Sequence, residues 1–83
     1  MFEYFELLND EQLDFIADEF GILKGNINST TADSLYDEIG LIEADEVISA
    51  NGGPLSRRGK LAASIVTVLG NALAEDMGWI NKK

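Results

Sequence analysis

The stretch Leu61-Ala-Ala-Ser-Ile-Val-Thr-Val-Leu-Gly-Asn-Ala-Leu-Ala74 contains no charged residue, whereas the other long stretches of the chain carry acids. At about 100° per residue, its large apolar side chains cover a broad face of a helix and its polar side chains form a narrow strip. Because an ordinary surface helix buries an arc of roughly 100°, this pattern predicts a central helix over residues 56–76 with other helices packed around it. The stretch is too short to span a membrane, which needs about 20 apolar residues.

A third side of this helix carries only small residues, namely Gly59, Ala63, Thr67, Gly70 and Ala74. The four-residue spacing of small side chains is typical of close helix crossings. Glycine inside a helix costs roughly 1 kcal/mol relative to alanine, so close contact at Gly70 is a reasonable expectation. The small-residue stripe therefore predicts either a tight contact with another helix of the same chain or the self-association surface of a homodimer.

The composition restricts the class of protein. Eighty-three residues are enough for a single domain over residues 1–83, and 46% apolar residues are enough for a core. The chain has no cysteine and no histidine, which removes thiolate chemistry, the usual general base and the usual metal ligand. We therefore expect a protein that is not an enzyme and uses no metal ion or other cofactor. The acidic start of the chain does not resemble a signal peptide, which favours a cytoplasmic location.

The charge is distributed unevenly along the chain. Residues 1–53 hold thirteen acids and one base, whereas residues 54–83 hold two acids and five bases. These parts carry −12 and +3, which together give the net charge of −9. Because nucleic-acid phosphates are bound by basic surfaces, this balance argues against direct nucleic-acid binding. It favours a basic surface on another protein as the partner.

Local signals predict further helices before the central one. Residues 1–8 are aromatic-rich and are expected to dock on the core through Phe2, Phe5 and Leu8, as a short helix or an extended arm. Near the other end of the chain, Trp79 is expected to pack back on the bundle. Asn9 and Gln12 match a capping box, and apolar residues recur at helical spacing from there to Gly21, which is expected to end the helix.

The middle of the chain predicts two short helices separated by Gly40. The first is expected to be capped by Thr30 or Thr31, and the second covers residues 41–50. In the second helix we expect Leu41, Ala44, Val47 and Ile48 to point inward and Glu43, Asp45 and Glu46 to point outward. Asn51-Gly-Gly-Pro54 breaks the chain, and Ser56 caps the central helix. The predicted fold is thus all-α, with four to five short helices packed around a central C-terminal helix.

Acidic residues gather in two ranges of the chain, residues 10–19 and residues 37–46. Asp10, Asp14 and Asp18 recur at every fourth position although like charges at this spacing repel each other. Phe15 lies off the main apolar face, and an exposed ring among acids is expected to anchor a partner. The predicted partner-binding surface, on which the protein would act as a regulator or inhibitor, consists of Asp10, Glu11, Asp14, Phe15, Asp18, Glu19, Asp37, Glu38, Glu43, Asp45 and Glu46.

Three cations crowd the first turns of the central helix, where the helix dipole disfavours positive charge. These are Arg57, Arg58 and Lys60. Either they pair with the acidic helices of the same chain, or they contact an anion or an acidic partner at the helix start.

One short motif gives an alternative function. Ala32-Asp33-Ser34-Leu35 resembles the Asp-Ser-Leu phosphopantetheine site of acyl carrier proteins, which are similarly small, acidic and four-helical. This resemblance implies a carrier protein that is modified at Ser34.

A second motif gives another alternative. Ile42-x-x-x-Glu46-Val47-x-x-Ala50-x-Gly52-Gly53 resembles the ending of the double-glycine leaders of exported bacteriocins and modified peptides. This resemblance implies a leader over residues 1–53, cleavage after Gly53 and a cationic helical product over residues 54–83.

Overall fold

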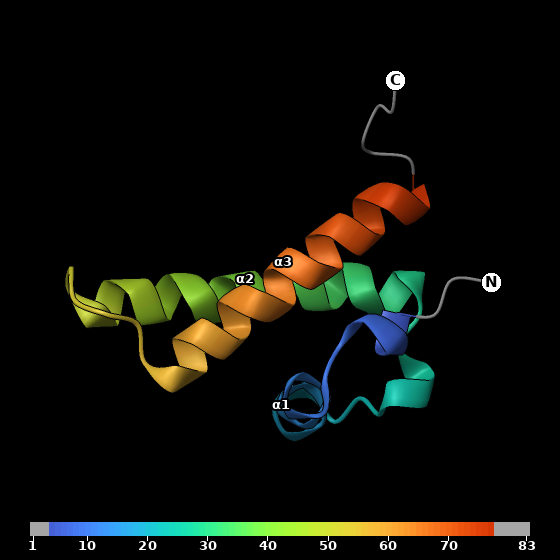
Figure 1. Ribbon diagram of the computed structural model, residues 1–83, viewed down its shortest axis with the longest axis horizontal. Coiled ribbons are helices and arrows are strands. Elements are labelled where there is room, and N and C mark those ends of the chain that lie inside the picture. The colour runs from blue at the N-terminus through green and yellow to red at the C-terminus, as the bar shows by residue number, and fades with distance from the viewer. Residues whose placement is uncertain (1–3, 78–83) are drawn as a thin grey trace.

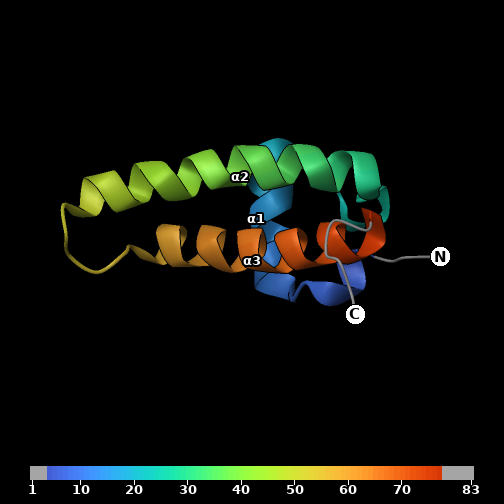
Figure 2. The same cartoon turned by 90° about the horizontal axis from the view of Figure 1, so that it is seen from above.

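The computed structural model describes residues 4–77, and all regular structure in that range is helical. Two helices, α2 and α3, run antiparallel side by side, and α1 lies across one side of the pair (Figures 1 and 2). The predicted all-α class is confirmed, but the described residues form three α-helices and not four to five. In chain order the elements are η1 (Tyr4–Leu7), α1 (Asp10–Phe20), η2 (Lys24–Asn26), α2 (Ser29–Ala50) and α3 (Arg57–Met77), where η denotes a short 3-10 helix.

The two helices expected in the middle of the chain are one continuous helix, α2. The expectation that Gly40 ends a helix is wrong, because a glycine inside a helix costs only about 1 kcal/mol and the hydrogen-bonded turns on both sides offset that cost. The cap is also not the expected one. Asn28 Oδ1 accepts hydrogen bonds from the backbone N–H groups of Thr30 and Thr31, both at 3.0 Å. Asn51, in the left-handed conformation at φ 50°, ends the helix.

The other predicted helix ends are confirmed. Asn9 and Gln12 form both hydrogen bonds of a capping box, each 2.8 Å long. Gly21 ends α1 in the left-handed conformation at φ 69°. Ser56 Oγ accepts a hydrogen bond from the backbone N–H of Gly59 at 3.1 Å, which caps α3.

The core lies between α1 and the α2/α3 pair. As predicted, α3 is the central helix, because it contacts α1, α2 and η1. Its buried side covers much more than an ordinary surface stripe, and its polar strip is exposed. Phe5 is half-buried and Leu8 buried as expected, whereas Phe2 and Trp79 lie outside the described residues. The largest fully buried side chains are Tyr4, Ile16, Leu35, Ile39, Ile65, Leu69 and Leu73.

The small-residue stripe of α3 lets α2 approach closely. A Cβ atom added to Gly59 would lie 2.9 Å from Glu46 Cβ, and one added to Gly70 would lie 2.9 Å from Tyr36 Cε1. Gly59 and Gly70 thus serve a helix crossing within the chain, which is one of the two alternatives that the stripe predicted. Ala74 in the same stripe is buried, Ala63 is half-buried and Thr67 is exposed.

The second half of α2 is oriented differently from the prediction. Leu41, Val47 and Ile48 were expected inward but are 65%, 50% and 75% exposed, and Ala44 is exposed as well. The buried residues of α2 all lie in its first half. Glu43 and Glu46, expected outward, are half-buried. The reason is geometric, because α1 crosses only part of the α2/α3 pair and does not cover the second half of α2 (Figure 2).

Candidate functional site

Part of the predicted acidic surface is used inside the chain. Glu11 forms an ion pair with Arg57, and Glu19 forms one with Arg58. Arg58 Nε also lies 3.5 Å from Glu46 Oε2. The two arginines therefore pair with acidic helices of the same chain, as one of the two alternatives predicted. The carboxylates of Glu11, Glu19 and Glu46 are therefore engaged by arginines of the same chain.

The expectation that Phe15 is an exposed anchor is wrong. Its side chain is 8% exposed and belongs to the core. Arg58 covers it, with the guanidinium carbon 5.6 Å from the ring centroid. The physical reason is that the start of α3, distant in sequence, closes over this side of α1.

Three further acids of α1, Asp10, Asp14 and Asp18, are exposed and lie in a row along the helix, which we call the α1 acidic row. None of them forms an ion pair with a described residue. At about 100° per residue they point away from Ile16, which is fully buried against the rest of the fold. The α1 acidic row therefore faces solvent, while the opposite side of α1 packs against the core.

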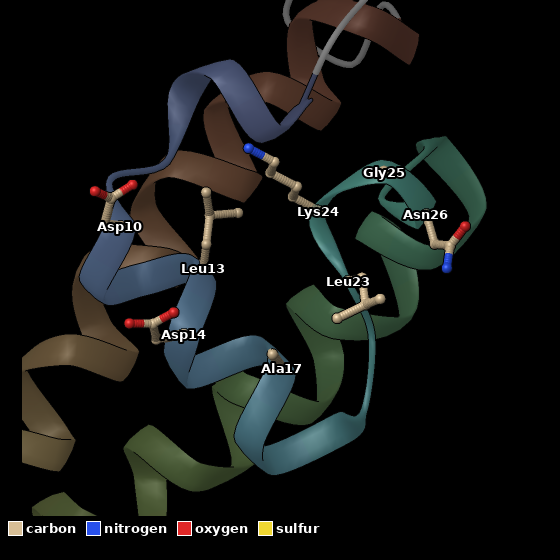
Figure 3. Close-up of a pocket in the computed structure, with 8 residues that line it drawn as sticks. All are labelled: Asp10, Leu13, Asp14, Ala17, Leu23, Lys24, Gly25 and Asn26. Carbon is tan, nitrogen blue, oxygen red and sulfur yellow. The ribbon is translucent and has the colours of Figure 1, made fainter.

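A hollow lies beside the α1 acidic row, between α1 and η2. Its volume is about 750 Å³. Figure 3 shows Leu13 and Leu23 on opposite sides of this space, with Asp10 and Asp14 along the α1 edge. Leu23 is 64% exposed although it is a large apolar residue. The residues that line this α1 hollow are Asp10, Leu13, Asp14, Ala17, Leu23, Lys24, Gly25 and Asn26.

Lys24 is the basic residue of the α1 hollow, but it does not neutralise the acids. Its side chain extends toward η1 (Figure 3), where Nζ lies 6.0 Å from the centroid of the Phe5 ring. Lys60, the third cation predicted for the start of α3, is exposed and forms no ion pair with the part of the chain that the structure describes.

The sequence did not indicate the α1 hollow. The acids on one wall were predicted as partner contacts, but the opposite wall belongs to a loop that has no helical or strand pattern. The one signal that could have indicated it is a large apolar residue, Leu23, within a loop rich in glycine and asparagine. A hollow of this kind depends on where the loop that contains Leu23 lies relative to α1, and only the tertiary structure decides that position.

The acids predicted on α2 have varied surroundings. Asp37, Glu38 and Asp45 are exposed, and Glu43 is half-buried. None of the four forms an ion pair within residues 4–77. They lie in the part of the chain where the apolar residues Leu41 and Ile48 are also exposed.

The modification position of the first motif and the cleavage position of the second are both accessible. Ser34 is exposed in the second turn of α2. Gly52 and Gly53 lie in an exposed turn, and the Gly53 N–H donates a hydrogen bond of 2.9 Å to the Ala50 carbonyl oxygen. However, cleavage after Gly53 would separate α3, with its buried Ile65 and Leu69, from the rest of the core.

Among residues 4–77, no group of three or more acids is placed to hold a metal ion. None of the helices in that range combines the length and apolarity that crossing a membrane requires. Comparisons of the chain with protein-family models, with curated proteins and with solved structures found no significant match.

Proposed function

We propose that this chain is a non-enzymatic binding protein that uses the α1 acidic row and the α1 hollow to hold a basic surface of another protein. The observation that supports the proposal is the contrast between two sets of acids. Glu11 and Glu19 on one side of α1 are paired within the chain, whereas Asp10, Asp14 and Asp18 are exposed and unpaired beside a hollow. Binding of this kind would make the protein a regulator or inhibitor of its partner.

The α1 hollow suits a lysine or arginine side chain of the partner. Such side chains lay their aliphatic stems along apolar surface and keep the charged end at a polar edge. Leu13, Ala17 and Leu23 offer the apolar surface, and Asp10 and Asp14 offer carboxylates at its edge. Arginine can also bind a carboxylate through two parallel hydrogen bonds, which adds geometric selectivity.

The row needs no reorganisation before it binds. The capping box at Asn9 fixes the start of α1, and the buried Ile16 fixes its rotation. Three like charges at four-residue spacing destabilise a helix by about 0.2–0.5 kcal/mol per pair, so neutral residues would favour the fold. A cationic partner relieves this repulsion. The negative electrostatic potential of the row also raises the association rate with such a partner at low salt.

The proposal is tested by affinity capture from an extract of the source cells, with the captured protein identified by mass spectrometry. The Asp10→Asn/Asp14→Asn variant is expected to lose capture, and raised salt is expected to weaken capture by the unaltered protein. The matched control is Glu6→Gln/Asp33→Asn, which removes two exposed acids outside α1. Equal loss of capture in both variants would show a nonspecific charge effect, and unchanged capture by the α1 variant would refute the proposal.

A further inference from the structure

The second half of α2 carries the largest group of exposed large apolar side chains that the structure describes. Five large apolar residues are strongly exposed, and three of them, Leu41, Val47 and Ile48, lie within eight consecutive residues of this helix. Single exposed leucines are common on protein surfaces, but a group on one helix marks an interaction surface.

This exposure follows from the arrangement of the helices. The buried residues of α2 end at Ile39, and beyond that point α2 lies beside the start of α3 and the loop before it, where Ser56 Oγ donates a hydrogen bond of 2.7 Å to Glu46 Oε1. That contact uses the opposite side of the helix, where Glu46 meets Gly59 and its carboxylate lies near Arg58. The side that carries Leu41 and Ile48 is therefore left open on the half of the α2/α3 hairpin that extends beyond α1 (Figures 1 and 2).

Acids flank these apolar residues at regular spacing. Asp37 and Asp45 lie four residues before and after Leu41, and Ile48 lies seven residues after it. At about 100° per residue, Asp37, Leu41, Ala44, Asp45 and Ile48 fall within an arc of about 100°, which we call the α2 outer stripe. The whole of α2 contains no basic residue. The α2 outer stripe thus carries both exposed apolar side chains and acidic side chains that have no basic residue of α2 beside them.

We propose that the α2 outer stripe binds an amphipathic helix of a partner protein that carries apolar residues flanked by lysine or arginine. Leu41 and Ile48 are about 10 Å apart along the helix axis, which matches apolar residues separated by two turns on a facing helix. Basic residues beside them would face Asp37 and Asp45. The inference rests on the proposed function in that the partner is a basic protein, but it involves different residues.

The charge of the stripe argues against a second copy of this chain as the occupant. Two stripes facing each other about Ala44 would bring the Asp45 side chains of both copies close together at the centre. Each copy also carries a net charge of −9. Like charges placed opposite each other across an interface cost affinity, whereas a cationic helix would gain from the same acids.

The test uses a fluorescent synthetic helix of three heptads, with leucine at the a and d positions and lysine at e and g, titrated with the full-length protein. One control peptide has glutamate in place of lysine, and another has the same composition in scrambled order. We expect the lysine peptide to bind at least tenfold more tightly than either control. Leu41→Ser/Ile48→Ser is expected to weaken its binding at least tenfold.

Matched protein variants test whether the α2 outer stripe is the surface that binds the peptide. Leu7→Ser removes an exposed leucine from η1 and should change the affinity less than twofold, as should Glu6→Gln, which removes an exposed acid from the same element. Circular dichroism and thermal unfolding check that each variant is folded. Because the substituted residues are exposed, we expect all of these variants to keep the fold, so weaker binding would report on the surface.

Several outcomes would overturn the inference. Equal affinity of the unaltered protein and Leu41→Ser/Ile48→Ser would do so, and so would equal binding of the lysine and scrambled peptides. Sedimentation equilibrium that finds a dimer abolished by Leu41→Ser/Ile48→Ser would replace the partner helix with a second copy. Failure of the proposed function is distinguishable, because it appears as cellular capture that Asp10→Asn/Asp14→Asn leaves unchanged.

Discussion

Arg58 at the start of α3 forms an ion pair with Glu19 at the end of α1, with a second hydrogen bond of 3.1 Å from Nη2 to Glu19 Oε1. The same guanidinium lies against Glu46 of α2 and over the ring of Phe15. One side chain therefore connects all three α-helices. This arrangement explains why cations occupy the start of α3, where the helix dipole alone disfavours them.

The two arginines at the start of α3 are predicted to differ in their effect on stability. The Arg57 side chain is 86% exposed and has one acidic partner, whereas Arg58 is 43% exposed, has two acidic partners and covers an aromatic ring. Exposed ion pairs contribute little because water screens them. Arg58→Ala should therefore lower the thermal midpoint clearly more than Arg57→Ala. Equal thermal midpoints of the two variants would contradict the conclusion that Arg58 connects the three α-helices.

Acidification is predicted to weaken the contact between α1 and α3. The hydrogen bond from Arg58, reinforced by its positive charge, lowers the pKa of Glu19 below its ordinary value of 4.5. A carboxyl group whose pKa is lower in the folded state stabilises the fold above the unfolded pKa and loses this effect as the pH falls through the folded value. Denaturant unfolding of the unaltered protein and Glu19→Gln between pH 7 and about pH 3 should therefore give curves that converge at low pH.

Alkaline conditions are predicted to destabilise the junction between η1 and the end of α3. The buried Tyr4 hydroxyl donates a hydrogen bond of 2.6 Å to Asp76 Oδ2. Burial, that hydrogen bond and the negative charges of Asp76 and Asp33 raise the pKa of Tyr4 to about 12 from an ordinary 10.0. Because the folded pKa is the higher one, this contribution is complete below pH 10.0 and is lost as the pH rises toward about 12.

Tyr4→Phe tests this prediction, because it removes the ionisable hydroxyl. The free energy of unfolding of the unaltered protein should fall more steeply above pH 10.0 than that of the variant. Tyr36→Phe is the control and should retain the steep alkaline loss. If Tyr4→Phe kept the same slope as the unaltered protein, the hydroxyl of Tyr4 would not be its source.

Two glycines inside helices are predicted to respond to alanine with opposite signs. Nothing lies within 4 Å of a Cβ atom added to Gly40, so Gly40→Ala should stabilise the fold by about 0.5–1 kcal/mol. A Cβ atom on Gly59 would meet Glu46 Cβ at 2.9 Å and Leu55 Cβ at 3.4 Å. Overpacking of this kind costs about 1–3 kcal/mol, so Gly59→Ala should destabilise. Urea unfolding measures both changes, and stabilisation by Gly59→Ala would show that α2 and α3 are not in close contact there.

The α1 acidic row is the part of the candidate site that the sequence predicted. Asp10, Asp14 and Asp18 stand on the polar side of a helix whose start and end are set by nearby residues, so their exposure follows from local spacing. Glu11 and Glu19 follow the same local pattern, yet they are engaged by arginines 46 and 39 residues away in the chain. No local pattern indicates such pairs, because they depend on where α3 begins relative to α1.

The sequence by itself determined the all-helical class, the cap at Asn9, the end at Gly21 and the broad buried side of α3. Each of these depends on spacing within one helix or on a capping residue beside it. Only the tertiary structure decided which side of the second half of α2 is buried. That helix has apolar residues on two sides, one with Leu35 and Ile39 and the other with Leu41 and Ile48. Helical periodicity permits burial of either side, and the positions of α1 and α3 leave Leu41 and Ile48 exposed.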